Sequence, residues 1–189
     1  MIYFIADLHL GHDNIIELCN RPFSTIEEMD ETIINNWNKK IHKNDTIYIL
    51  GDMIWEDADP TKYLSQLEGK KILIIGNHDI KWLNKGDYSS YFEKIVYMDL
   101  IPAGISPNGH TITLCHYPML EWQGSRKIGS RKEGYHIYGH IHARVSKEYQ
   151  SLYQNNNAYN AGVDINNFTP VTIEELKINN ELFKKKFFE

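Results

Sequence analysis

The chain has 189 residues, of which 42% are hydrophobic and 24% charged, values that are typical of a globular protein and exclude a disordered one. Its formal net charge of −5 argues against a protein that binds nucleic acid over an extended surface. No apolar run approaches the roughly 20 residues of a membrane-spanning helix, and only two cysteines are present, so we expect a cytoplasmic protein that makes no membrane contact.

The first half of the chain alternates between strand and helix patterns. Short apolar runs predict strands at 2–6, 46–50 and 71–75. Helical patterns fall between and after them, at 14–20, from a capping box of Ser24 and Glu27 to Trp37, at 61–67 and at 88–94. This alternation indicates an α/β protein with parallel strand pairing.

The second half consists mostly of strand patterns. They cover residues 95–100, 111–115, 135–138 and, more weakly, 158–161. Consecutive strands without helices between them predict an added antiparallel portion. The polar segment 121–134, which contains three glycines, is typical of a long loop.

Polar side chains follow five of the predicted strands, at the point where each strand ends. They are Asp7 and His9, Asp52, Asn77 and His78, His116, and His140 with His142. In an open α/β sheet, ligands bind at the carboxyl ends of the strands, so we expect these residues to meet in one site. A single aspartate or histidine after a strand is commonly a turn residue, but five strand ends of this kind are hard to obtain by chance.

The chemistry of these side chains indicates metal ions. They offer imidazole nitrogens with carboxylate and amide oxygens, and no thiolate joins them, which favours manganese, iron, zinc, nickel or cobalt over a cysteine-type zinc site. Without His78, seven ligands are available. Seven are too many for one open ion and suit two divalent ions that share a carboxylate; the alternative is a single ion with spectator side chains.

The order of these motifs resembles that of the calcineurin-like metallophosphoesterase superfamily, in particular its compact bacterial and phage-encoded members. The motifs are Asp7-x-His9, Gly51-Asp52, Gly76-Asn77-His78-Asp79, His116 and Gly139-His140-x-His142. The resemblance extends from Asp7 to about Asp164. It implies a four-layer fold in which two mixed sheets lie face to face between helices. The length of the chain predicts a single domain over residues 1–189.

The resemblance also implies a role for each residue. One metal would be held by Asp7, His9, Asp52 and His142, and the other by Asp52, Asn77, His116 and His140. Asp52 would bridge the two ions, and a hydroxide shared by them would attack phosphorus in line. His78 would act near the leaving group as a general acid. Asp79 would either hold the imidazolium of His78 or cap the following helix.

Basic residues suggest where phosphate groups of a substrate would bind. Arg126, Lys127 and Arg131 lie in the 121–134 loop, which separates His116 from His140 and so suggests a position beside the metals. A solvated surface loop is the alternative. Arg21, after the first predicted helix, is a further candidate for a phosphate contact.

We therefore expect a metal-dependent hydrolase of small phosphate esters, most readily of phosphodiesters such as cyclic or linear nucleotides. A phosphomonoesterase or a nuclease that processes nucleic-acid ends is the nearest alternative. A metal-free interaction scaffold is the alternative from a different class, against which the intact ligand set and His78 argue.

Overall fold

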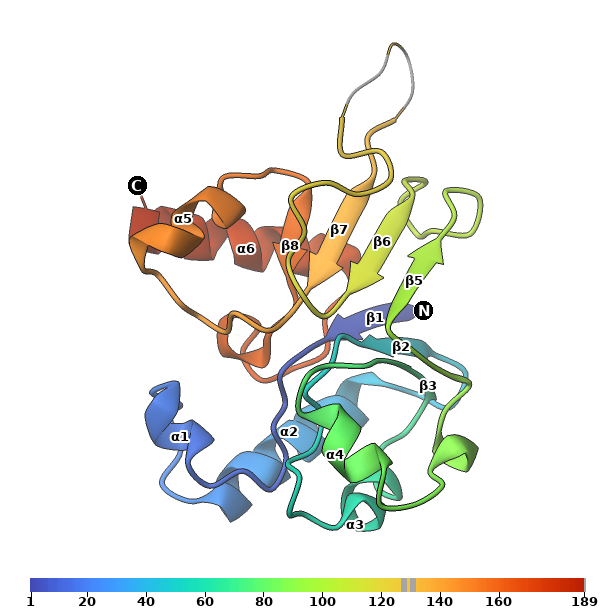
Figure 1. The fold of residues 1–189 in the computed structure, drawn as a ribbon, viewed down its shortest axis with the longest axis vertical. Helices are drawn as coiled ribbons and strands as arrows, with labels where there is room; N and C mark the ends of the chain where they lie inside the picture. The colour runs from blue at the N-terminus through green and yellow to red at the C-terminus, as the bar shows by residue number, and fades with distance from the viewer. Residues whose placement is uncertain (127–128, 130–131, 189) are drawn as a thin grey trace.

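The computed structural model describes residues 1–126, 129 and 132–188, which form two four-stranded sheets packed face to face (Figure 1). The first sheet contains, in this order, β1 (Ile2–Ile5), β2 (Thr46–Ile49), β3 (Lys70–Ile74) and β4 (Lys94–Val96). The second sheet contains β5 (Met98–Ile101), β6 (Ile112–Cys115), β7 (Tyr135–Tyr138) and β8 (Ala158–Asn160). The first sheet is parallel throughout, and the second is mixed because β5 runs antiparallel to β6.

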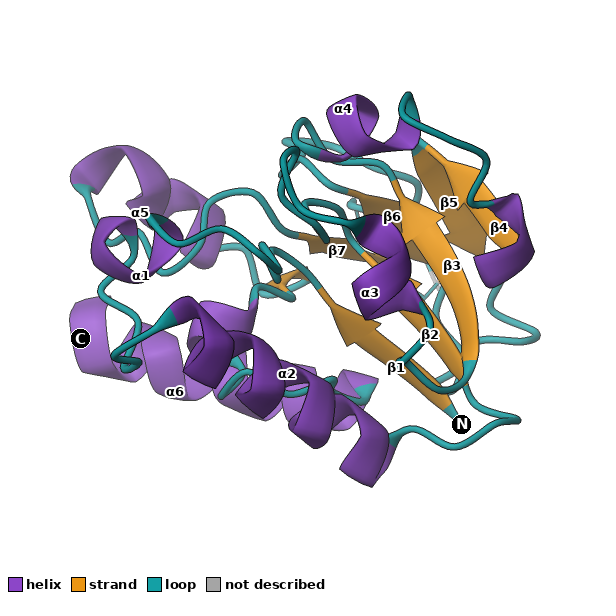
Figure 2. Ribbon diagram, turned by 90° about the horizontal axis from the view of Figure 1, so that it is seen from below, coloured by secondary structure: helices purple, strands orange, loops and turns teal. Residues whose placement is uncertain are grey.

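Helices cover the two outer faces of this pair of sheets (Figure 2). The helices on the side of the first sheet are α1 (Ile15–Leu18), α2 (Ile26–Lys40), α3 (Pro60–Leu64) and α4 (Asp79–Leu83). Helices α5 (Lys147–Tyr153) and α6 (Ile173–Phe188) contact the second sheet at β8. The predicted four-layer arrangement is therefore confirmed.

Across the described ranges, no helix combines the length and apolarity that crossing a membrane requires.

Side-chain alternation along the strands explains the layers. Tyr3 and Ile5 of β1 belong to the core between the first sheet and its helices, together with Trp37. Phe4 lies between them in sequence and belongs to the core between the two sheets, together with Leu114 of β6. Successive strand residues face opposite sides of a sheet, so a strand that is buried on both faces is apolar along its whole length.

The predicted strand 95–100 is two strands in different sheets. β4 ends at Val96 in the first sheet, and β5 begins at Met98 in the second. The exposed residue Tyr97 is the only one between them, so the chain passes from one sheet to the other here. Both strands are short and apolar in sequence, which makes them look like a single continuous strand.

The second half is less antiparallel than the sequence predicts. β6, β7 and β8 run parallel to one another, and only β5 is antiparallel to its neighbour. A parallel crossover needs about a dozen residues or more. The connections 116–134 and 139–157 are long enough for this, although the first contains no helix in its described part.

Helix boundaries differ from the predictions in two places. The cap of α2 is Thr25, whose hydroxyl accepts from the N–H of Glu28 at 3.2 Å, so the capping box lies one residue later than expected. The predicted helix 88–94 is a 3₁₀ turn at Ser89–Tyr91. There the carboxylate of Asp87 accepts from the N–H of Ser89 at 2.9 Å, a local turn that competes with a regular helix.

The sequence patterns do not predict α5 and α6, and they indicate α4 only as a helix that would follow Asp79. For α6 a signal was present, because Thr172 and Glu175 form a capping box at its start. The helix then contributes Leu176 to the core between the sheets and Phe183 to the cluster beneath α5. It therefore packs beside both β1 and β8, and its second half covers part of the outer side of the second sheet.

Candidate metal centre

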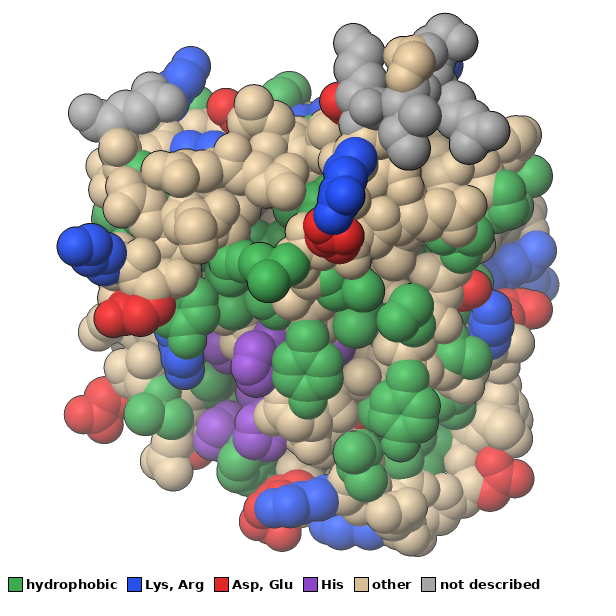
Figure 3. All heavy atoms as spheres, turned by 45° about the horizontal axis from the view of Figure 1, so that its top comes forward, with side chains coloured by type: hydrophobic (Ala, Val, Ile, Leu, Met, Phe, Trp, Pro, Cys, Tyr) green, Lys and Arg blue, Asp and Glu red, His purple; other side chains and the backbone are tan. Residues whose placement is uncertain are grey.

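The carboxyl ends of strands from both sheets bring the predicted ligand residues to one edge of the molecule, where histidines gather at the surface (Figure 3). Ligand atoms of Asp7, His9 and His142 lie within 4.8 Å of one another. Ligand atoms of Asp52, His116 and His140 form a second such group. Both groups combine residues from the first and the second sheet, so the site exists only where the two sheets meet.

One oxygen of Asp52 faces both groups. Its Oδ2 atom lies 3.8 Å from Nε2 of His9, in the first group, and 3.4 Å from Nε2 of His116, in the second. Its other oxygen, Oδ1, accepts a hydrogen bond from the backbone N–H of His78 at 2.9 Å. The carboxylate is thus held with one oxygen directed between the two groups.

The second group contains ring nitrogens and an amide oxygen that face one another. Nδ1 of His116 donates to the carbonyl of Leu50 at 2.7 Å, which leaves Nε2 with a lone pair in the neutral imidazole. Oδ1 of Asn77 lies 3.1 Å from that Nε2 and 3.1 Å from Nδ1 of His140. Either a proton or a cation must relieve the repulsion between such lone pairs, so these donors fit a divalent cation.

The first group also contains imidazole nitrogens that could bind a cation. Nδ1 of His142 bonds to Oδ2 of Asp164 at 2.9 Å, and its Nε2 remains for a cation. Both ring nitrogens of His9 are buried without a hydrogen-bond partner among the described residues. Buried polar atoms normally have a partner, so an unpaired imidazole here points to a ligand. Nitrogen and oxygen donors of this kind suit borderline divalent metals.

Five of the seven ligand residues adopt a left-handed backbone conformation. The φ angles are 58° at Asp7, 53° at His9, 52° at Asp52, 71° at His140 and 50° at His142. This conformation costs a residue other than glycine about 1–2 kcal/mol. It persists only where the surrounding structure enforces it, and such strain concentrates at functional sites.

Glycines beside the ligands leave room for this packing. A Cβ atom on Gly51 would collide with Nδ1 of His116, and one on Gly76 would collide with Oδ1 of Asp52. Gly51 also has a φ of 83°, a conformation that glycine adopts without strain. The Gly-Asp and Gly-Asn motifs are therefore needed for close approach as well as for turning the chain.

Asp79 holds the two ligand loops of the first sheet together. Its fully buried carboxylate accepts from the backbone N–H groups of Asp52 and Gly76 at 2.8 Å, and from Met53 N–H and Trp82 Nε1 at 2.9 Å. Within the described part of the chain its hydrogen bonds go to these four donors, so it does not support His78. It is also not the cap of the following helix, because the N-cap of α4 is His78 and Asp79 is the first residue of the helix. It ties the loop of Asp52 to the start of α4.

Arg21, which the sequence suggested as a substrate contact, is buried instead. Its Nε atom donates to Asp164 at 2.9 Å, and its Nη atoms donate to the carbonyls of Asp7 at 2.7 Å and Leu8 at 2.9 Å. With no exposed side-chain surface, Arg21 supports the first ligand loop and Asp164.

The sequence analysis did not identify Asp164 as a site residue, although it follows the weak strand pattern at 158–161 as the other site residues follow their strands.

The described part of the 121–134 loop lies away from the metal ligands (Figure 1). His110, which precedes β6, donates from Nδ1 to the carbonyl of Glu133 at 2.7 Å, whereas His116 follows the opposite end of β6. Because β6 and β7 are parallel, the chain must return to the far end of the sheet before β7 begins. The predicted position beside the metals is therefore incorrect for this part of the loop.

Of the three basic residues proposed for that loop, Arg126 lies in its described part. Arg126 is exposed and pairs with Glu121. Lys127 and Arg131 lie outside the described residues. Arg126 is therefore engaged by a carboxylate, whereas the phosphate contacts expected of Lys127 and Arg131 stay predictions.

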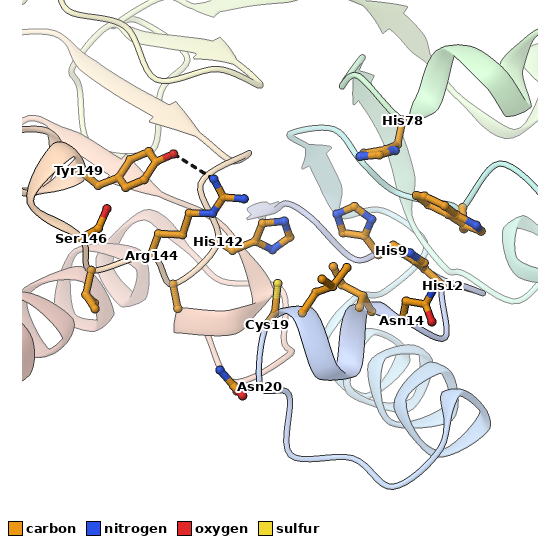
Figure 4. A pocket seen from close by; sticks show the side chains of 15 residues that line it. His9, His12, Asn14, Cys19, Asn20, His78, His142, Arg144, Ser146 and Tyr149 are labelled. Carbon is orange, nitrogen blue, oxygen red and sulfur yellow. Dashed lines mark hydrogen bonds between the residues drawn. The ribbon is translucent and has the colours of Figure 1, made fainter.

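His78 lies beside the open part of the site. With His9 and His142 it lines a cavity of about 800 Å³ (Figure 4). Its ring centre is 5.3 Å from that of His9 and 5.0 Å from that of Trp55. The imidazole is half-buried and therefore accessible to a molecule in this cavity.

In the protein without cations, burial and interactions between charged groups shift the pKa values of the ligand residues. Burial raises the pKa of Asp7 to about 6. Burial would also raise the pKa of Asp52, but hydrogen bonding and charge interaction with His116 outweigh it and lower this pKa to about 2. Against the effect of burial, Asp52 raises the pKa of His116 to about 9, and Asp164 raises that of His142 to about 10. Two imidazolium ions therefore offset part of the negative charge of the buried carboxylates at neutral pH.

In comparisons with known proteins, one family model matches most of this chain. The model of the calcineurin-like phosphoesterase family matches residues 1–173. An uncharacterized protein of Methanocaldococcus jannaschii is 34% identical over 176 residues, covering 92% of this chain and 87% of that protein. The gene 66 protein of Mycobacterium phage L5 is 33% identical over 135 residues, covering 62% of this chain and 63% of that protein.

A solved structure shows a similar fold. The crystal structure of a protein of unknown function from Aquifex aeolicus superposes with a TM-score of 0.67 and 29% sequence identity. The match covers 94% of this chain and 98% of that one. The similarity therefore extends over nearly the whole fold of both proteins.

Metal binding should release protons and should strengthen as the pH rises. The pKa values of about 9 for His116 and about 10 for His142 mean that both imidazoles carry a proton at pH 7 that a cation must displace. We expect release of about two protons at pH 7, measured by titrating demetallated protein with Mn²⁺ calorimetrically in buffers of different ionisation enthalpy. Proton release near zero would contradict this assignment of charges.

Asp79→Asn should weaken both folding and metal binding. The amide NH₂ cannot accept, so at least one of the buried N–H donors now bound to Asp79 loses its partner. We expect a loss of about 1–3 kcal/mol in the free energy of unfolding and about 10- to 100-fold in metal affinity. Asp87→Asn, at an exposed turn, is the control. Unchanged metal affinity in Asp79→Asn would show that this carboxylate does not position Asp52.

Proposed function

The chain belongs to the calcineurin-like phosphoesterase family, and from that premise we propose that it hydrolyses phosphodiesters, with small cyclic or linear nucleotides as the preferred class. The observation that carries the proposal is the meeting of two groups of nitrogen and oxygen donors at Asp52. Such a pair of sites suits phosphate ester hydrolysis with two divalent cations.

The donor groups suggest how the ligands are divided. Asp7, His9 and His142 would hold one cation, and Asn77, His116 and His140 the other, with Asp52 shared between them. Manganese, iron, zinc, nickel and cobalt are the ions that this set of donors favours. When bound, the two cations would supply Lewis acidity, which neutralises charge on the phosphoryl oxygens and lowers the pKa of a water molecule.

The protein's own side chains would orient the ester and manage protons. In hydrolysis, a bond forms between phosphorus and a water oxygen while the bond from phosphorus to the leaving oxygen breaks. His78, which lines the cavity, would donate a proton to that leaving oxygen. The amide of Asn77 contributes an oxygen without adding a negative charge that would repel the phosphate.

The size of the cavity favours a diester over a monoester. Its volume of about 800 Å³ far exceeds that of a phosphate group and lies within the range of sites for whole small ligands. Apolar and aromatic residues, among them Ile15, Leu18 and Trp55, line part of it. A second organic group on the phosphate would therefore find both space and contact.

Activity should depend on added metal and should be greater on the diester. Demetallated protein, reloaded with each candidate ion in turn, is assayed with bis-p-nitrophenyl phosphate and with p-nitrophenyl phosphate. We expect no turnover without metal, and with the best ion a kcat/KM at least about tenfold higher for the diester, because the cavity accommodates its second ester group. Faster monoester hydrolysis would make the protein a phosphomonoesterase. Failure to bind two equivalents of metal, together with no hydrolysis, would favour the scaffold.

His78→Ala should discriminate between leaving groups. An alkoxide needs a proton as it departs, whereas a nitrophenolate does not, so the loss of a general acid should slow alkyl esters by about 10²- to 10⁴-fold and nitrophenyl esters far less. Steady-state rates on a dinucleotide and on bis-p-nitrophenyl phosphate measure this difference. His42→Ala, at an exposed position in the turn before β2, is the matched control. Equal losses on both substrates would remove His78 from the role of acid.

A further inference from the structure

The cavity beside the metal centre has two unlike walls on opposite sides of the histidines. Arg144, Ser146 and Tyr149 lie on one side of His142 and His9, and His12 lies on the other (Figure 4). Trp55 stacks on His12 and therefore belongs to the second wall. A ligand that fills the cavity would touch both walls, with its middle part beside the histidines.

The indole of Trp55 is a fixed platform. Its ring is parallel to that of His12, with an interplanar angle of 2° and ring centres 3.5 Å apart, and His12 itself is buried. Trp55 is half-buried and lines the cavity, whereas the other three tryptophans are buried in the cores. A tryptophan held on one face and accessible from a cavity is suited to stacking on a planar group such as a nucleobase.

The guanidinium of Arg144 is available to an anion. Its Nη1 atom donates to the hydroxyl of Tyr149 at 2.9 Å, and its exposed side chain has no carboxylate within 4.0 Å among the residues that the structure describes. Arg21 and Arg126, by contrast, are each paired with a carboxylate. An arginine with unused N–H groups beside a tyrosine hydroxyl is a good binding site for phosphate.

We propose that this cavity binds a linear phosphodiester that carries a planar base on one side of the scissile phosphate and a second phosphate on the other. The base would stack on Trp55, and the second phosphate would bind Arg144 and Tyr149. This inference rests on the proposed function and narrows its substrate class, because a cyclic mononucleotide has only one phosphate and that phosphate would be at the metals.

The position of His78 gives the substrate a direction. His78 lies 5.0 Å from Trp55, measured between ring centres, on the same side of the cavity. Since His78 would protonate the leaving oxygen, the alcohol that departs is the one that carries the stacked base. The second phosphate would remain on the product that keeps the newly hydrolysed phosphoryl group.

The Arg144 part of the proposal is tested with thymidine dinucleotides. TpT, pTpT and TpTp share the same internal diester, and the last two carry a terminal phosphate at one end or the other. The wild-type holoenzyme should cleave the internal linkage of one phosphorylated dinucleotide with a kcat/KM about tenfold or more above that of TpT. Arg144→Gln should abolish this advantage, so that the ratio of kcat/KM between that dinucleotide and TpT falls to about one.

Lys147→Gln is the matched control, because it removes one positive charge from the exposed first turn of α5 outside the cavity lining. It should retain the advantage of the terminal phosphate. Equal losses on TpT and on the phosphorylated dinucleotides in Arg144→Gln would mean that Arg144 acts on the scissile phosphate, which overturns the proposal. The absence of any rate advantage in the wild type would overturn it as well.

Trp55 is tested by binding. Adenosine 5′-monophosphate should quench the tryptophan fluorescence of the wild-type holoenzyme, and ribose 5-phosphate should not. In Trp55→Phe the nucleotide should still bind, because phenylalanine also stacks, but without quenching. Quenching that persists in Trp55→Phe would overturn the stacking site.

Bis-p-nitrophenyl phosphate separates this inference from the proposed function. If the wild type hydrolyses neither it nor any dinucleotide, the proposed function fails and the substrate class fails with it. If bis-p-nitrophenyl phosphate is hydrolysed and the terminal phosphates have no effect, only the substrate class is rejected.

Discussion

The carboxylate of Asp52 lies between two groups of metal-ligand side chains, and much of the surrounding structure holds it there. One of its oxygens faces an imidazole of each group, and the other accepts from the N–H of His78. Its own backbone N–H is bound by the buried carboxylate of Asp79. A negative charge fixed at this point, among imidazoles that offer lone pairs once their protons are displaced, is an arrangement that divalent cations stabilise.

The strained turns at the strand ends are the conformational cost of this arrangement. Left-handed conformations at Asp7, Asp52 and His140 are unfavourable in isolation. Each is enforced by contacts to backbone groups: Asp79 binds the turn at Asp52, Arg21 donates to the carbonyl of Asp7, and the carboxylate of Asp7 accepts from the N–H of His140 at 2.9 Å. The ligand residues and the residues that support them therefore form one network across both sheets, which explains how short loops can hold so many charged groups at fixed positions.

Sequence reasoning succeeded where local patterns determine the outcome. Apolar runs that end in Asp, Asn or His predicted both the strands and the edge at which their side chains meet. It failed where contacts between segments far apart in the chain determine the position of a residue. The 121–134 loop was expected beside the metals because it lies between His116 and His140, but the parallel pairing of β6 and β7 carries its described part to the far end of the sheet. Arg21 pairs with Asp164, 143 positions later in the chain, and no local pattern contains that contact.

The central claim is that two cations meet at Asp52, and anomalous diffraction tests it most directly. Crystals of the protein grown with Mn²⁺, measured near the manganese absorption edge, should show two peaks, each at coordinating distance from the Asp52 carboxylate. One peak should also be bound by His9 and His142, and the other by His116 and His140. A single peak, or two peaks of which one lies away from Asp52, would contradict the account.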